Sequence, residues 1–317
     1  YVLYCTYGTY TILTAERTDD RMVSIRNLKK SYKQFPVLRG LNMDINDGDV
    51  YGFLGRNGCG KTTTMNIIAN VIPKDEGDIM LGDGERKIKI GYLPESPTIF
   101  GYMTAREYLE YIAACAGYDG DISRRTEEVL DIVGLRDAAD RRTKGFSRGM
   151  TQRLGMGAAI FRNPELLIFD EPTSALDPQG RVEVINIINR LKSMGCTIVL
   201  STHILSDVER VANRIGIMNG GVLAEEGEIG AIMRKYGGDI VNLKVRNLTQ
   251  ESKLTLLKAD FVRAEFNNET ELFRFGTDNA EETARRLMRL LADNDIVAES
   301  FNIGTATLEE VFRKVVG

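Results

Sequence analysis

A glycine-rich segment at residues 55–62 has the residue types and spacing of a phosphate-binding loop. Its sequence, GRNGCGKT, fits the pattern G-x-x-x-x-G-K-[ST] at every defined position. Glycines let successive backbone amides curl around phosphate oxygens, and a following helix N-terminus adds partial positive charge. Lys61 would neutralise the β- and γ-phosphates of a nucleotide, and the Thr62 hydroxyl would hold Mg²⁺. A chance glycine-rich turn is the weaker alternative, because an apolar run precedes the loop and a helical pattern follows it.

The whole loop is predicted to contact the nucleotide, mostly through its backbone. The predicted contacts are Gly55, Arg56, Asn57, Gly58, Cys59, Gly60, Lys61, Thr62 and Thr63. Cys59 could be an oxidation-sensitive thiol that controls the site. The simpler interpretation is a small residue that contributes only its backbone.

Two acidic residues end an apolar run at residues 166–170, which read LLIFD and are followed by Glu171. A nucleotide-binding sheet places its second magnesium contact at such a strand end, and this predicts that role for Asp170. Glu171 could polarise an attacking water as a general base, a contribution of about 10²–10⁴ in rate. Two solvated acids at a strand end are the alternative.

A second anion-binding helix N-terminus is predicted at residues 146–150, which read FSRGM. The Ser147 hydroxyl and the amides around Gly149 precede a helix, where they can bind phosphate oxygens. Read alone, the serine is equally well explained as an ordinary helix cap. The residues themselves leave both interpretations open.

These segments follow one another in an order that resembles the ATPase subunit of ATP-binding cassette (ABC) transporters. The resemblance spans residues 22–227, about two thirds of the chain, and includes six motifs. It implies that Tyr32 stacks on adenine, that Asp177 closes the D-loop sequence SALD, and that His203 in STH is the switch histidine at the γ-phosphate. By the same resemblance, Lys61, Glu171 and His203 are the catalytic residues.

The signature segment departs from the family sequence LSGGQ. Phe146, Arg148 and Met150 replace three of the five residues, whereas Ser147 and Gly149 are retained. In the family this segment closes over the ATP held by the other copy in a head-to-tail dimer. The departures therefore put the details of that contact in doubt, and its existence less so.

A second departure lies at Glu95, where the family usually has a glutamine that contacts Mg²⁺ and couples to the membrane subunits. A carboxylate can still coordinate magnesium, because hard cations take oxygen ligands. It adds negative charge near the phosphates, so we expect metal affinity or coupling to differ from that of the family. An acidic residue on a surface loop is the alternative.

The function implied is binding and hydrolysis of ATP with Mg²⁺, powering a separate transmembrane permease through ATP-driven dimerisation. The signature form and the sequence TLEEVFRK at residues 307–314 resemble the exporter branch. The expected location is the cytoplasmic face of the membrane, as a peripheral subunit. The alternative is a soluble cassette ATPase acting on the ribosome or DNA, but such relatives usually carry two cassettes, a long coiled coil or a zinc hook. The transported substrate does not follow from the sequence.

Composition excludes several other classes of function. The chain has 317 residues, 41 basic and 45 acidic side chains and a net charge of −4, which argues against a nucleic-acid partner. One histidine in the whole sequence excludes multi-histidine metal sites. Four cysteines without a Cys-x-x-Cys spacing are typical of a reducing compartment. No uncharged apolar run reaches the roughly 18 to 20 residues of a membrane span, so we expect the isolated chain to be soluble.

The elements that must position these residues alternate between strands and helices, which predicts an α/β fold with a largely parallel sheet. The apolar positions after Thr104 recur at helical spacing, and Thr104 and Glu107 form a capping box. Strands are expected at residues 22–28, 38–45, 49–54, 87–93, 166–169 and 197–201, and helices at 63–71, after 104, at 124–133, after 149 and at 181–194. The expected core is thus a P-loop NTPase sheet interrupted by a helical subdomain.

Beyond residue 230 the order β-α-β-β-α-β, followed by a helix, predicts a small ferredoxin-like α+β domain. The expected strands are 240–245, 261–266, 271–275 and 296–303, and the expected helices are 250–259, 280–291 and 307–315.

Four divisions of the chain follow. Residues 1–21 are expected to be a non-native or disordered extension before Met22, with a native strand as the alternative. Residues 22–230 are the nucleotide-binding domain, including the helical subdomain at about 100–161. Residues 231–238 are a linker, and residues 239–317 are the accessory domain.

Overall fold

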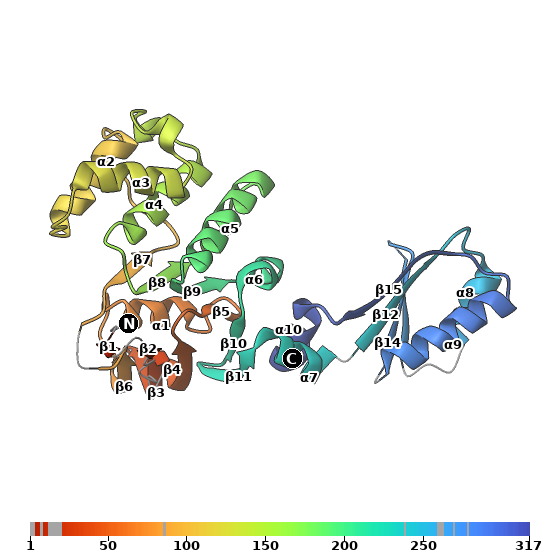
Figure 1. Cartoon of the computed structure of the whole chain (residues 1–317). Coiled ribbons are helices and arrows are strands. Elements are labelled where there is room, and N and C mark those ends of the chain that lie inside the picture. Colours follow the sequence, from red (N-terminus) through yellow and green to blue (C-terminus); the bar gives the residue numbers. More distant parts are fainter. Residues whose placement is uncertain are drawn as a thin grey trace.

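A six-stranded sheet forms the centre of the larger part of the molecule (Figure 1). The computed structural model describes residues 4–6, 9–11, 21–84, 87–237, 239–258, 263–268, 270–277 and 279–317. The strands are β5 (Val50–Gly55), β7 (Ile90–Leu93), β8 (Leu166–Asp170), β9 (Thr197–Thr202), β10 (Arg214–Asn219) and β11 (Val222–Glu228). Their order is β11-β10-β5-β9-β8-β7, parallel throughout except for β11, which pairs antiparallel with β10.

The two faces of this sheet bury alternate side chains, as a strand period of two requires. On one face Tyr51 and Phe53 pack with α1 (Lys61–Ile68) and an antiparallel sheet of three strands. Those strands are β3 (Arg21–Tyr32), β4 (Phe35–Asn46) and β6 (Glu76–Leu81). On the other face Val50 and Leu54 join a cluster that extends through the helices.

The helical subdomain stands at one end of this core (Figure 1). It contains α2 (Ala105–Cys115), α3 (Ile122–Ile132) and α4 (Arg148–Ile160). The predicted capping box is present, because Thr104 Oγ1 accepts from Glu107 N at 3.1 Å and Glu107 Oε2 accepts from Thr104 N at 2.7 Å. Two further helices, α5 (Pro178–Ser193) and α6 (Leu205–Val211), cover the face of the central sheet on which Val50 and Leu54 lie.

The C-terminal part contains a four-stranded antiparallel sheet of order β13-β14-β12-β15. Its elements are β12 (Asp239–Val245), α8 (Gln250–Lys258), β13 (Arg263–Asn267), β14 (Leu272–Thr277), α9 (Ala280–Asp293) and β15 (Ala298–Thr305). Both helices lie on one face of the sheet (Figure 1). This is the ferredoxin-like order, and together with the parallel central sheet it confirms the predicted fold class.

Near this junction the secondary structure and packing differ from the expected division of the chain. Residues 231–237, expected to be a linker, form most of α7 (Ile229–Gly237), because Ile232 is 3% exposed and anchors the helix in the main core. The last helix, α10 (Leu308–Val316), was assigned to the accessory domain. Its Leu308 and Val311 are buried in the same main core, and it packs on α6, α7 and β10.

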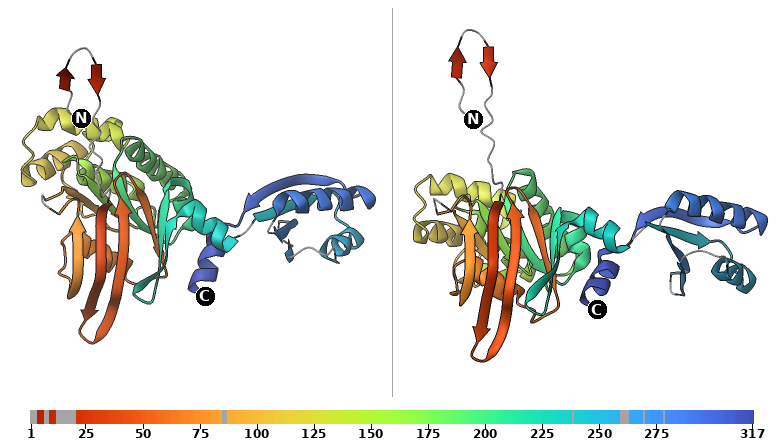
Figure 2. Two further views of the ribbon diagram at one scale, coloured as in Figure 1. Left: turned by 60° about the horizontal axis from the view of Figure 1, so that its bottom comes forward. Right: turned by 90° about the horizontal axis from the view of Figure 1, so that it is seen from below.

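At the other end of the chain, β1 (Tyr4–Thr6) and β2 (Thr9–Thr11) pair as an antiparallel hairpin, visible in Figure 2. The remaining residues up to 20 lie outside the described residues, as do Phe261 of an expected strand and Ala259 of an expected helix. Within the described part of the chain, no helix is both long enough and apolar enough to cross a membrane.

Candidate active site

The phosphate-loop sequence connects the buried strand β5 to helix α1, as predicted. Gly60 is the N-cap of α1 and has a φ of 111°, a left-handed conformation that favours glycine. A Cβ at this position would also lie 2.7 Å from Leu38 Cδ2. Lys61 is 6% exposed, and its ammonium donates to the Gly55 carbonyl at 2.8 Å. The loop is therefore closed on itself by the lysine that is expected to meet phosphate.

The first acidic residue, Asp170, lies at the carboxyl end of β8 and is 2% exposed. Its Oδ1 accepts from Thr62 Oγ1 at 3.2 Å and from Ser201 Oγ at 2.6 Å. Two of the three predicted magnesium ligands, Thr62 and Asp170, are thus in direct contact, and the third, Glu95, lines the cavity described next. Burial and the nearby negative charge of Asp170 raise the pKa of Tyr92 to about 12, so that phenol stays protonated.

The second acidic residue, Glu171, begins the turn that leaves β8. Its φ is 49°, which is unusual for a residue other than glycine and places strain at this position. The turn is held by Ser201, whose Oγ and carbonyl oxygen accept from Glu171 N at 3.0 and 3.2 Å. The Glu171 carboxylate contacts His203, with Nδ1 and Oε2 2.8 Å apart.

These groups surround one cavity of about 470 Å³. It is lined by Val37, Asn57, Gly58, Gly60, Lys61, Thr62, Thr63, Glu95, Glu171, Ser174 and His203. The charged side chains in this lining are one lysine and two carboxylates, and Asp170 lies behind Thr62. A cavity with amides and a lysine on one side and acidic groups on the other can hold a phosphate chain together with a cation.

Several predicted nucleotide contacts lie outside this lining. Tyr32 is 49% exposed at the end of β3, and its ring centroid is 5.9 Å from the Lys30 ammonium nitrogen. Val37 occupies the lining near that hairpin instead. Gly55 and Arg56 line a smaller neighbouring cavity of about 260 Å³.

The signature and D-loop residues cap helices at the surface. Ser147 Oγ accepts from Met150 N at 3.2 Å at the start of α4, and Asp177 Oδ1 accepts from Gly180 N at 3.0 Å at the start of α5. Gly149 lies against Gly180, since an added Cβ would be 3.7 Å from the Gly180 Cα. None of these three predicted contacts lines the cavity of this copy.

Cys59 is half-buried within the phosphate loop. Burial raises the pKa of its thiol above the ordinary value, with Lys61 acting in the opposite direction. The reactive thiolate is therefore disfavoured, which supports the interpretation of Cys59 as a small loop residue.

Sequence reasoning missed Ser201, which contacts both acidic residues. The sequence feature that could have identified Ser201 is a small polar residue near the end of a largely apolar run, TIVLST. Only the strand register reveals its partner, because Ser201 lies opposite Asp170 in the β8–β9 pair. Ser174 and Val37 also line the cavity and were not predicted to do so.

Comparisons with known proteins agree with this geometry. A family profile described as ABC transporter matches residues 38–174, and one described as the C-terminal domain of DrrA1-3-like ATP-binding proteins matches residues 227–316. The uncharacterized ABC transporter ATP-binding protein YxlF of Bacillus subtilis is 33% identical over 301 residues, 93% of this chain and 99% of that protein. The bacitracin transport ATP-binding protein BcrA of Bacillus licheniformis is 33% identical over 308 residues, 93% of this chain and 97% of that protein.

One solved structure is similar over the larger part of the chain. It is a dimeric ATP-binding cassette in a post-hydrolysis state bound to ADP and phosphate, with 25% identity and a TM-score of 0.59. The match covers 66% of this chain and 99% of that chain. The chain therefore belongs to the family of ABC transporter ATP-binding proteins, whose cassettes bind and hydrolyse ATP.

Proposed function

We propose that this protein is the ATP-hydrolysing subunit of an ABC exporter and that it acts as a head-to-tail dimer on a separate membrane permease. The observation that supports this most directly is that Lys61, Thr62, Glu171 and His203 line one cavity, with Asp170 in contact with Thr62. As such a subunit, the protein would work at the cytoplasmic face of the membrane.

In this proposal the chain's own groups divide the work at the γ-phosphate. The loop amides and Lys61 would bind the phosphate chain, with the Lys61 ammonium exchanging its present carbonyl partner for phosphate oxygen. Glu171 would hold the attacking water and take its proton, and His203 would hydrogen-bond the γ-phosphate. Before ATP binds, the contact between His203 and Glu171 would keep the imidazole beside the carboxylate.

Mg²⁺ fits the donor set, because a hydroxyl and carboxylates are hard oxygen ligands. Thr62 and Asp170 would hold it, with Glu95 on the lining of the same cavity. Among the described residues no group of three or more His, Cys, Asp or Glu side chains is placed to hold a metal ion. In this proposal phosphate oxygens and water would complete the coordination of Mg²⁺. Bound Mg²⁺ would neutralise charge on the β- and γ-phosphates.

The dimer would account for the three predicted contacts at the starts of α4 and α5 that do not line the cavity. Ser147 and Gly149 lie at an accessible helix N-terminus that would meet the nucleotide of the second copy. Asp177 would lie at the same interface. The dimeric cassette bound to ADP and phosphate supports this arrangement.

An exposed aromatic patch supports docking to a permease. Phe100, Tyr102 and Tyr111 are 36%, 64% and 42% exposed. The Phe100 ring centroid is 5.8 Å from that of Tyr102 and 5.6 Å from that of Tyr111. Exposed apolar groups in contact with one another mark interaction sites, and this patch follows Glu95 along the chain. Similarity to a bacitracin transport protein supports export as the direction.

We further propose a division of labour along the chain. Residues 22–230 form the catalytic unit, with a helical subdomain at about 100–161, and residues 239–305 form the accessory unit. Helix α10 is assigned to the catalytic unit because its buried side chains join the main core.

The catalytic proposal is tested by steady-state ATP hydrolysis with the 317-residue chain. Activity is expected with Mg²⁺ and is expected to be lost on adding EDTA or in Lys61→Ala. Retained hydrolysis in Lys61→Ala would contradict the assignment of the phosphate loop.

The partner proposal is tested by co-purification with the membrane protein encoded beside this chain. Tyr102→Glu with Tyr111→Glu should abolish co-purification and leave basal ATPase activity intact. Met194→Glu is the matched control, since Met194 at the end of α5 is 57% exposed, is not part of the patch and should have no effect. Co-purification unchanged by the double substitution would remove this patch as the docking surface.

A further inference from the structure

Helix α10 reaches the nucleotide-binding loops from the C-terminal end of the chain. Its Phe312 lines a cavity of about 260 Å³. The other lining residues are Gly55, Arg56, Asn57, Thr202, His203 and Leu205. Phe312 is therefore beside both the phosphate loop and the histidine expected to sense the γ-phosphate. It does not line the nucleotide cavity itself.

The helix is fixed in this place by contacts along its length. Leu308 and Val311 are fully buried in the main core, and Leu308 N donates to Glu209 Oε1 on α6 at 2.5 Å. Near its end, Lys314 Nζ donates to the Tyr236 carbonyl of α7 at 2.6 Å. These bonds hold α10 between α6, which follows the histidine, and α7. Phe312 thus lies on a helix with little freedom to move.

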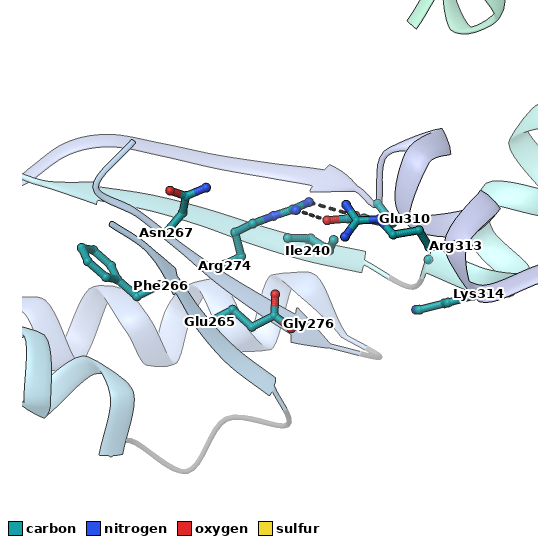
Figure 3. Close-up of a pocket in the computed structure, with 11 residues that line it drawn as sticks. Ile240, Glu265, Phe266, Asn267, Arg274, Gly276, Glu310, Arg313 and Lys314 are labelled. Carbon is teal, nitrogen blue, oxygen red and sulfur yellow. Dashed lines mark hydrogen bonds and ion pairs between the residues drawn. The ribbon is translucent and has the colours of Figure 1, made fainter. Parts of the chain in front are cut away.

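The first turn of α10 is also tied to the accessory sheet. Arg274 of β14 forms a two-pronged ion pair with Glu310, and the second contact, from Nη2 to Oε2, is 3.1 Å. Glu310 Oε2 also accepts from Thr307 N at 3.0 Å and so completes the capping box of the helix. Figure 3 shows Arg274 extending from the sheet to Glu310 across a cleft of about 620 Å³. Through Glu310, the cap of α10 depends on a residue of the accessory sheet.

We propose that Phe312 is a positioning residue for ATP hydrolysis, which holds the phosphate loop and His203 in place relative to each other. We further propose that the Arg274–Glu310 ion pair fixes the position of α10. This inference rests on the proposed ATPase site. Phe312 forms one wall of a cavity whose other walls are loops that must meet the same phosphate, so removing its ring enlarges that cavity and frees those loops to shift. Misplacement of reacting groups by about 1 Å can cost about 10²-fold in rate.

The test is steady-state MgATP hydrolysis by the 317-residue chain carrying Phe312→Ala, Phe312→Leu or Val311→Ala. Phe312→Ala should lower kcat by about 10- to 100-fold. Phe312→Leu should recover most of the loss by refilling the space. Val311→Ala is the matched control, because it removes buried atoms from the same helix away from the loops. It should lower the melting temperature and leave kcat unchanged.

Two results would overturn the proposal. One is a Phe312→Ala variant with the kcat and KM of wild type, and the other is an equal loss of kcat in Val311→Ala. Affinity for a fluorescent ATP analogue gives a readout that needs no turnover, and Phe312→Ala should weaken it several-fold. A wild-type chain that binds the analogue but hydrolyses no ATP would count against the proposed function alone.

The role of Arg274 is tested by a double-mutant cycle. Arg274→Gln should lower kcat less than Phe312→Ala, and adding it to Phe312→Ala should cause no further loss. Losses that multiply in the double variant would show that the ion pair does not act through α10.

Discussion

At the residue scale, the two groups expected to act on the γ-phosphate contact each other. His203 Nδ1 is 2.8 Å from Glu171 Oε2, and the His203 side chain is 51% exposed toward the cavity. Glu171 is held more firmly, by its strained turn and by Ser201. We therefore expect the exposed imidazole of His203 to move when ATP binds, and Glu171 to stay in position to hold the attacking water.

His203→Ala should therefore reduce kcat for ATP hydrolysis by about 10²–10³, the usual cost of removing one donor that stabilises developing charge. Binding of a fluorescent ATP analogue should be nearly unchanged, because Lys61 and the phosphate loop remain. Both quantities are measured on the same preparation. Wild-type turnover in this variant would contradict the switch role.

A second residue-scale prediction concerns Glu226, which is half-buried beside Tyr51. Its Oε1 accepts from Tyr51 Oη at 2.9 Å and from Asp44 N at 3.0 Å. Burial raises the pKa of this carboxyl above its ordinary value. The folded state thus favours the protonated form, and the stability this gives is present below the unfolded pKa and lost as pH rises through the folded one.

Glu226→Gln removes this pH dependence. The variant should be more stable than wild type at pH 7, on the order of 1 kcal/mol, and the difference should shrink as the pH falls toward 4. Thermal melts from pH 4 to 8 measure it.

Glu225→Gln is the matched control with the opposite sign. A hydrogen bond from Lys235, and a second from Tyr236, lower the pKa of Glu225. That variant should be less stable than wild type at pH 7, by less than about 1 kcal/mol because Lys235 is exposed. Its deficit should disappear as the pH falls through the lowered folded pKa. The same sign for both variants would contradict the assignment.

At the scale of elements, two helix caps allow effects on the stability of the fold to be distinguished from effects on dimerisation. Ser147 caps α4 and Thr104 caps α2, each with a hydroxyl that accepts from a backbone amide. Either residue changed to alanine should cost about 0.5–2 kcal/mol of unfolding free energy.

Only Ser147→Ala should also weaken ATP-dependent dimerisation, because its hydroxyl is expected to meet the nucleotide of the partner. Thr104→Ala serves as the control of equal stability cost. Light scattering in the presence of ATP measures the dimer. Equal dimerisation by both variants would leave Ser147 with the cap role alone.

The elements that sequence reasoning predicted well carry strong local patterns. The apolar strand before residues 55–62 and the capping box at Thr104 are examples, and both stand where expected. Helix α6 and strand β11 were not predicted. The helix spans only Leu205–Val211, and β11 is half-exposed along its length, so neither gives a clear period. Helix α7 exists because Ile232 packs in the core, a tertiary effect that the sequence Arg-Lys-Tyr-Gly-Gly conceals.

The same distinction applies to the candidate site. Motif spacing predicted Lys61, Thr62 and Glu171, and the family resemblance implied Glu95 and His203. The structure brings all five to one cavity. Residues whose contribution depends on strand register or on long-range packing could not be found this way. Ser201 acts through its place opposite Asp170, and Phe312 approaches the loop from more than 100 residues away in sequence.

At the scale of the whole molecule, two sheets are joined by a pair of helices. Helices α7 and α10 lie between the central sheet and the accessory sheet in Figures 1 and 2. Strand β12 leaves α7, and the paired strand β15 returns to α10. The accessory sheet is thus connected to the catalytic unit where α10 passes the phosphate loop. This arrangement allows the accessory sheet to influence ATP hydrolysis in the catalytic unit.

In the proposed mechanism ATP joins two copies of this chain, and hydrolysis that depends on Glu171 then separates them. The most direct test is the mass of Glu171→Gln in solution with Mg²⁺ and ATP, measured by size exclusion with light scattering. The predicted result is a species of twice the 35.4 kDa chain mass, absent without ATP and absent when Lys61→Ala is added. A Glu171→Gln chain that remains monomeric with ATP and turns it over at the wild-type rate would contradict the account.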